Sequence, residues 1–155
     1  MSEGLNIKTS HEDDNLVVTF SGLIDEDSSF ESIENKLNGN VIFDFEEVSL
    51  INSCGIREWV TFLESVDKGT ILTYRNCRQI IIEQVNMVHG FIRDGARIES
   101  FYAPYYCEEC DQEHKVHLNV ADVKDGKAPE IKCPKCKTAD LEFDAIEEQY
   151  FQFIK

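Results

Sequence analysis

Long apolar stretches are absent from this 155-residue sequence. No run of Ala, Val, Ile, Leu, Met, Phe, Trp, Tyr or Cys exceeds three residues, whereas a membrane-spanning helix needs about 20 apolar residues in succession. The sequence therefore predicts no membrane insertion. Residues 1–14 are polar and acidic and lack the basic-then-apolar layout of a secretion signal, so we expect a cytoplasmic location.

Positive charge is also scarce. The chain has 15 Lys and Arg against 30 Asp and Glu, which gives a formal net charge of −15. A surface this anionic repels phosphate backbones and anionic lipid headgroups. We therefore do not expect nucleic acid as a partner, whereas a protein partner suits the composition.

Signatures of catalysis are missing as well. The sequence contains no Gly-rich phosphate loop, no nucleophile–His–acid set at a recognisable spacing and no metal site with an open position. We therefore do not expect an enzyme. The 42% of apolar residues suffices for a core, and the length suits one ordinary domain or a small domain with an appendage.

Short apolar segments alternate with helical patterns before residue 106. We expect strands at residues 5–8, 16–20, 41–45, 71–74 and 97–106, the last one interrupted at Pro104. The helical patterns cover residues 28–38, 56–68 and 78–92, the first of them through Phe30, Ile33 and Leu37. Strands separated by helices of this length indicate an α/β fold with a mixed β-sheet that is parallel in its centre.

Four of the six cysteines form two C-x-x-C pairs that are separated by 22 residues: Cys107 with Cys110, and Cys133 with Cys136. Thiolates bind zinc at about 2.3 Å, and four of them complete a tetrahedron with no position left for water. The spacing therefore predicts a structural Zn²⁺ site. An iron site can share this spacing, and disulfides are disfavoured in the expected compartment.

The segment after residue 106 has the layout of a zinc ribbon. A strand pattern over 114–120, a turn over 124–129 and a short strand at 141–143 would join the two cysteine pairs. The residues after 106 are too few to build a secure apolar core, and we therefore expect the metal to stabilise the fold of this segment. We expect two domains, residues 1–106 and 107–155, the second a small β appendage whose apolar tail packs back on the protein. His114 and His117 lie nearby, but the four cysteines fill the metal shell.

Ser53 lies just ahead of the helical pattern over 56–68. Backbone N–H groups and the helix dipole stabilise negative charge at such a position, so a phosphate on Ser53, which adds about −1.5 to −2 charges, would be well placed. The alternative is that Asn52 or Ser53 simply caps the helix.

Residues from about Leu16 to Phe101 resemble a STAS domain, the module of anti-sigma factor antagonists and sulfate-transporter tails. The matching features are an apolar strand with Asp44 and two short stretches, Ser21-Gly22-Leu23-Ile24-Asp25 and Val48-x-x-Ile51-Asn52-Ser53-x-Gly55-Ile56. The resemblance implies a bacterial signalling module that binds a switch kinase or anti-sigma factor through the Ser53 loop and the following helix. It also implies that phosphorylation of Ser53 abolishes binding. The implied partner-binding residues are Asp25, Asn52, Ser53, Cys54 and Gly55.

Two positions depart from the family pattern. Asn52 replaces the usual Asp, and Cys54 replaces a second hydroxyl residue. The alternative function is therefore a STAS scaffold subunit of a transporter or larger complex that is not phosphorylated. Cys54, beside a helix N-terminus, suits either a redox sensor or a small semi-buried residue. The sequence does not predict the oligomeric state.

Overall fold

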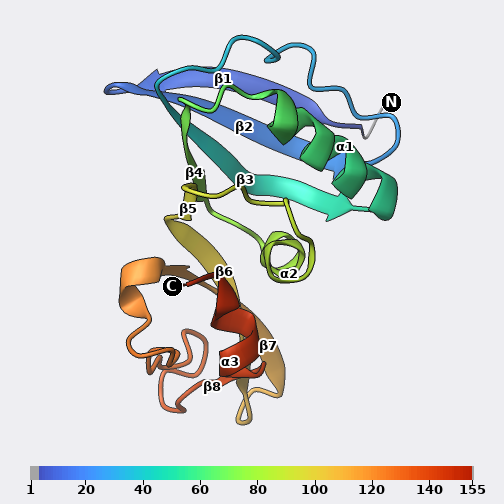
Figure 1. Ribbon diagram of the computed structural model, residues 1–155. Helices are drawn as coiled ribbons and strands as arrows, with labels where there is room; N and C mark the ends of the chain where they lie inside the picture. Colours follow the sequence, from blue (N-terminus) through green and yellow to red (C-terminus); the bar gives the residue numbers. More distant parts are fainter. Residues whose placement is uncertain (1–3, 155) are drawn as a thin grey trace.

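The computed structural model describes residues 4–154, which form a mixed α/β fold with two β-sheets (Figure 1). The first sheet has the strand order β1-β2-β3-β4-β5. Its strands are β1 (Asn6–Glu12), β2 (Asn15–Ile24), β3 (Asn40–Ile51), β4 (Ile71–Arg75) and β5 (Arg97–Ile98). The β1–β2 pair is antiparallel and the other pairs are parallel, so the prediction of a mixed sheet with a parallel centre is confirmed.

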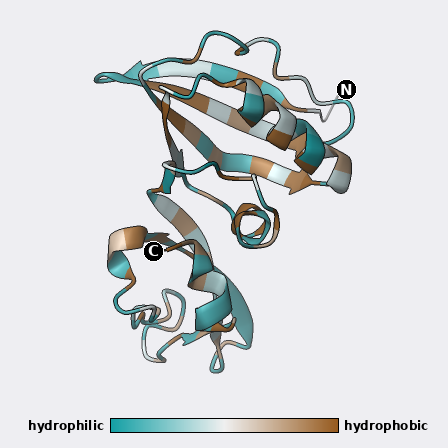
Figure 2. Ribbon diagram, viewed as in Figure 1, coloured by the Kyte–Doolittle hydropathy of each residue, from teal (hydrophilic) through white to brown (hydrophobic). Residues whose placement is uncertain are grey.

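Helix α1 (Ser53–Ser65) covers one face of this sheet (Figure 1). The sequence places Trp59, Phe62 and Leu63 on one side of the helix, and all three are buried. The Trp59 ring centroid lies 5.4 Å from that of Phe20 and 5.2 Å from that of Phe43. This aromatic cluster forms the core between β2, β3 and α1, and Figure 2 shows the hydrophobic residues that run along these strands.

The prediction of a helix over residues 28–38 is wrong, because the structure has no helix between β2 and β3. One turn of helical hydrogen bonding, from Glu34 N to Phe30 O at 3.0 Å, is followed by Asn35 in the left-handed conformation with φ +65°. The three apolar residues of the stripe are nevertheless buried. The segment between β2 and β3 therefore buries Phe30, Ile33 and Leu37 without forming a helix.

Helix α2 (Gln79–Met87) is shorter than the predicted 78–92. The chain leaves the helix after Met87 because the next segment is bound to the core. Both Trp59 Nε1 and Tyr74 Oη donate hydrogen bonds to the carbonyl of Phe91, at 2.9 and 2.7 Å. Gly90, with φ +93°, supplies the turn that this path requires.

The second sheet has the order β7-β6-β8 and consists of β6 (Ser100–Cys107), β7 (Gln112–Asn119) and β8 (Glu142–Phe143), all antiparallel. The predicted strand over 97–106 is interrupted at Glu99, between β5 and β6, and Pro104 lies within β6. The second sheet thus begins at Ser100, ahead of the boundary predicted at residue 106. Residues 1–3 and 155, the ends of the two predicted domains, lie outside the described residues.

The chain ends in α3 (Glu147–Tyr150) and a 3-10 turn over Phe151–Phe153, and a second 3-10 turn, Val120–Asp122, follows β7. The tail packs on β6 and α2. Tyr150 Oη donates a 2.6 Å hydrogen bond to the carbonyl of Tyr102, and Asn86 Nδ2 donates a 2.9 Å bond to the carbonyl of Tyr150. Within residues 4–154, none of the helices has the length and apolar character needed to cross a membrane.

Candidate functional site

The two C-x-x-C pairs meet at one end of the second sheet. Cys107 ends β6, Cys110 lies in the turn to β7, and Cys133 and Cys136 lie on a turn that the Lys137 N to Cys133 O bond closes at 2.9 Å. All four sulfur atoms lie within 4.8 Å of one another. The four cysteines could therefore hold one metal ion.

The distances between the sulfurs fit a metal site and not a disulfide. Cys107 Sγ lies 3.9 Å from Cys136 Sγ, and Cys110 Sγ lies 3.8 Å from Cys133 Sγ. Four sulfurs at about 2.3 Å from a central ion have a tetrahedral edge of about 3.8 Å, whereas bonded sulfurs are about 2.05 Å apart. All four cysteines are free thiols.

Backbone N–H groups stabilise negative charge on part of the four-sulfur cluster. The amides of Cys110 and Cys136 donate to the sulfurs of Cys107 and Cys133, at 3.4 and 3.5 Å. Hydrogen bonds from the backbone of Ala139 and then Thr138 lower the pKa of Cys136 to about 6. Desolvation and then the neighbouring sulfurs raise the pKa of Cys110 to about 12. A bound cation would favour the thiolate form of all four cysteines.

His114 lies against this cluster, a contact that the sequence did not predict. Its Nε2 atom is 3.7 Å from Cys133 Sγ, while His117 on the same strand faces away and meets Asn76. His114 does not belong to the four-sulfur group, so it contacts the site from outside. Strand alternation along 114–120 indicates that the two histidines lie on opposite faces, but not which face holds the metal.

The loop after β2 and the start of α1, which contain the residues predicted to bind a partner, are in contact. Asn52 N donates to the carbonyl of Ile24 at 3.1 Å, which joins the loop after β2 to the start of α1. The Asn52 side chain accepts a 2.8 Å bond from Gly55 N and donates a 3.0 Å bond to Glu26 Oε1. Asn52 is thus the N-cap of α1, and the capping interpretation is confirmed for Asn52.

The five residues of this surface differ in exposure. Ser53 and Cys54 are exposed at the first two positions of α1, and the N-cap Asn52 is exposed as well. Asp25 is half-buried, and its Oδ1 accepts a 3.0 Å hydrogen bond from Asp27 N. Gly55 is buried. A Cβ atom at Gly55 would lie 2.0 Å from the carbonyl oxygen of Ile24, so only glycine allows α1 to begin this close to β2. Gly55 therefore shapes the surface and does not present a side chain to it.

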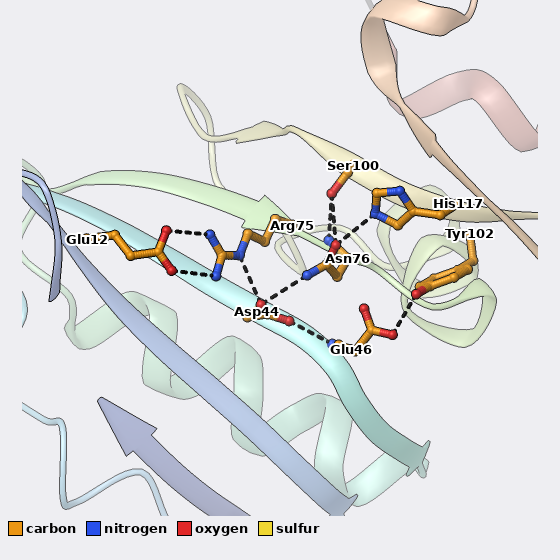
Figure 3. A network of polar contacts seen from close by, with 8 residues as sticks. All are labelled: Glu12, Asp44, Glu46, Arg75, Asn76, Ser100, Tyr102 and His117. Atoms are coloured by element: carbon orange, nitrogen blue, oxygen red, sulfur yellow. Dashed lines mark hydrogen bonds and ion pairs between the residues drawn. The ribbon is translucent and has the colours of Figure 1, made fainter. Parts of the chain in front are cut away.

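A polar network centred on Asp44 connects the first sheet to the chain that enters the second (Figure 3). The buried Asp44 carboxylate accepts from Arg75 Nε at 2.9 Å and from Asn76 Nδ2 at 3.0 Å. Arg75 also binds Glu12 in a bidentate pair at 3.1 and 3.0 Å, which lowers the pKa of Glu12, first through these hydrogen bonds and then through the charge. Arg75, the last residue of β4, therefore ties β3 and β1 to β4 through Asp44 and Glu12.

The network continues into the second sheet. Asn76 Oδ1 accepts from Ser100 Oγ at 3.3 Å and lies 2.8 Å from His117 Nε2. Tyr102 Oη donates a 2.5 Å bond to Glu46 Oε2 nearby (Figure 3). These contacts couple β3, and the residue that follows β4, to β6 and β7.

Comparison with known proteins gives no assignment, because no family model and no curated protein matches this chain. The resemblance of residues 16–101 to a STAS domain stays a prediction. What the chain does has to be inferred from its own residues.

Proposed function

We propose that the chain is a non-enzymatic, STAS-like protein-interaction module that binds a switch kinase or anti-sigma factor. Its binding surface consists of the loop 24–28 and the first turns of α1. The observation that supports this most strongly is the contact of Asn52 with both Ile24 and Glu26, which brings Asp25 and Ser53 onto one surface. Arg57 and Glu58 extend this surface along the exposed side of α1.

Ser53 suits the role of the regulated residue in this proposal. It is exposed at the first position of a 13-residue helix, where the helix dipole stabilises added negative charge by about 0.3–1 kcal/mol. A phosphate would therefore be tolerated by the fold. It would add negative charge close to Glu26, which binds the neighbouring Asn52, and change how a partner meets the surface.

We further propose that the metal of the four-cysteine site is structural zinc and that residues 107–155 form a zinc ribbon. Four thiolates would fill the coordination shell, so the metal would stabilise the turns and supply no reactive position. This assignment agrees with a role in binding and not in catalysis.

The test is a pull-down from extract of the source cells with the full chain carrying Ser53→Ala or Ser53→Asp. We expect a kinase or anti-sigma factor to be retained by the alanine form and lost by the aspartate form. Ser10→Asp, which adds the same charge at an exposed position on β1, is the matched control and should retain the partner.

A specific observation also supports the second candidate, a scaffold subunit of a transporter or larger complex that is not phosphorylated. The Asn52 amide is already bound on both sides, and its bond to Glu26 places a carboxylate next to the residue that precedes Ser53. A phosphate on Ser53 would add to the negative charge of Glu26, with Arg57, one turn along α1, as the one cation of this surface. Recovery of the same partners with both Ser53 variants would favour this candidate.

A further inference from the structure

A pocket of about 310 Å³ lies where the two sheets meet. Its lining residues come from β3 in the first sheet, from β6 and β7 in the second, and from the beginning of α2. None of the six cysteines and no residue of the Ser53 surface lines it. Pockets for small molecules enclose about 300–1,000 Å³ and occur preferentially between domains, so the size and place of this pocket suit a small molecule.

Arg78 brings to this pocket a positive charge that no carboxylate of residues 4–154 pairs with. Its Nη1 atom donates a 3.0 Å hydrogen bond to the uncharged carbonyl oxygen of Glu46. A guanidinium has several N–H donors in a planar fork. Most of these donors of Arg78 are therefore open to a ligand, in a chain that has twice as many acidic as basic residues.

The Arg78 side chain is also held in place before any ligand binds. Its guanidinium carbon lies 5.7 Å from the centroid of the Tyr102 ring, a distance typical of a cation–π contact. Tyr102 Oη in turn donates to the carboxylate of Glu46 (Figure 3). Glu46 thus orients both the ring and the guanidinium, and a group that is already ordered loses less freedom when it binds a ligand.

The charges of the lining sum to one positive. Arg78 and Lys115 are its cations, and Glu83 is its one carboxylate. Lys115 Nζ also contacts Glu113 Oε1 at 3.2 Å, but both side chains of this pair are exposed, so the pair is weak. A ligand with one negative charge would match this balance, whereas a phosphate dianion would carry one charge more than the lining offsets.

We propose that this pocket binds a small organic monocarboxylate, with the carboxylate on Arg78 and an apolar body against Ile80 and the ring of Tyr102. The paired N–H donors of a guanidinium match the two oxygens of a carboxylate. Ile80 and Tyr102 line the same pocket and supply the apolar surface. The bound ligand would touch elements of both sheets and so stabilise their junction. The proposal does not depend on Ser53.

The test uses para-fluorobenzoate as the probe, titrated with the zinc-loaded full chain and followed by fluorine NMR. We expect Arg78→Gln to bind the probe at least about tenfold more weakly than the unsubstituted chain, because the charged partner of the carboxylate is lost. The Arg78 side chain makes no capping hydrogen bond to α2, so this variant should fold. Arg97→Gln, the same substitution at an exposed residue outside the pocket, is the matched control and should retain the affinity.

Circular dichroism and zinc content verify that each variant is folded. The proposal is overturned by no binding of the probe at millimolar concentration, by equal binding to Arg78→Gln and to the unsubstituted chain, or by equal binding of para-fluorobenzyl alcohol, which has no charge. Displacement of the probe by inorganic phosphate at equal concentration would also overturn it and would indicate a phosphate site. Ser53→Asp should leave the probe affinity unchanged, so a failure of the Ser53 switch and a failure of this pocket are distinguishable.

Discussion

At the scale of single residues, the Ser53 surface and the four-cysteine site each depend on one close contact. At the first, a side chain must be missing, and at the second, a histidine ring is present. Gly55 is the clearest case at the start of α1, because the carbonyl of Ile24 occupies the space of a Cβ atom. His114 is the corresponding case at the cysteines, because its ring meets one sulfur of the four. Each contact makes a quantitative prediction.

Gly55→Ala should lower the free energy of unfolding by about 2–3 kcal/mol, because α1 must move away from β2 to admit the methyl group. Gly69→Ala is the matched control. The nearest atom to a Cβ there is Asp67 Oδ2 at 3.9 Å, so its effect should stay within about 0.5 kcal/mol. Urea unfolding measures both, and equal midpoints for the two variants would contradict the close approach of α1 to β2.

His114→Leu should speed the loss of zinc to a chelator about tenfold, because an imidazole N–H donor to a ligand sulfur orients the ligand and offsets its charge. His114→Gln, which retains a donor, should show a smaller effect. His117→Gln, on the same strand but bound to Asn76, is the control and should release zinc at the unsubstituted rate. If all three variants release zinc equally fast, His114 has no role at the metal.

At the scale of elements, β6, β7 and the turns with the cysteines should depend on the metal. Chelation should broaden or shift the amide resonances of residues 100–143, while those of β2, β3 and α1 persist, because the aromatic cluster around Trp59 lies apart from the cysteines. Plasma mass spectrometry should find about one zinc per chain. Absence of zinc, with all four thiols open to alkylation in the native protein, would contradict the proposed site.

The elements also differ in how far the sequence predicts them. β2, β3, β4 and α1 were predicted because their apolar residues follow the strand or helix period over several positions, and α1 also has its cap in Asn52. The stripe of Phe30, Ile33 and Leu37 has a helical period, but Asn35 in a left-handed conformation ends the first turn. Pro104 indicated the wrong position for the break in the strand predicted over 97–106. The break lies at Glu99 because residues 97–98 pair with β4 in the first sheet, whereas residues 100–107 pair with β7 and β8 in the second. The sequence does not show which partner each half takes.

The candidate site was predictable to a similar degree. The cysteine spacing indicated the four-sulfur cluster because two short turns leave few ways to place the sulfurs. The grouping of Asp25 with Asn52 came from the STAS resemblance, and the parallel pairing of β2 with β3 brings the two strand ends together, with Asn52 bound to Ile24 and Glu26. The contacts of His114 and Asp44 were not predictable, since each depends on side chains brought together from distant parts of the chain.

At the scale of the whole molecule, the network of Figure 3 fixes the two sheets relative to each other. Because Asn76 Nδ2 donates to Asp44, its Oδ1 is the atom that faces His117, so His117 Nε2 must be the donor. The network thus runs from Glu12 on β1 through Asp44 to β7. The Ser53 surface beside the first sheet and the cysteine site at the end of the second are therefore held on one framework.

The central claim is that the Ser53 surface binds a protein partner. Hydrogen–deuterium exchange of the full chain, alone and with the protein recovered by the Ser53→Ala form, tests it most directly. We predict that binding slows exchange in residues 24–28 and 52–58. Unchanged exchange in residues 24–28 and 52–58 of the complex would contradict the account.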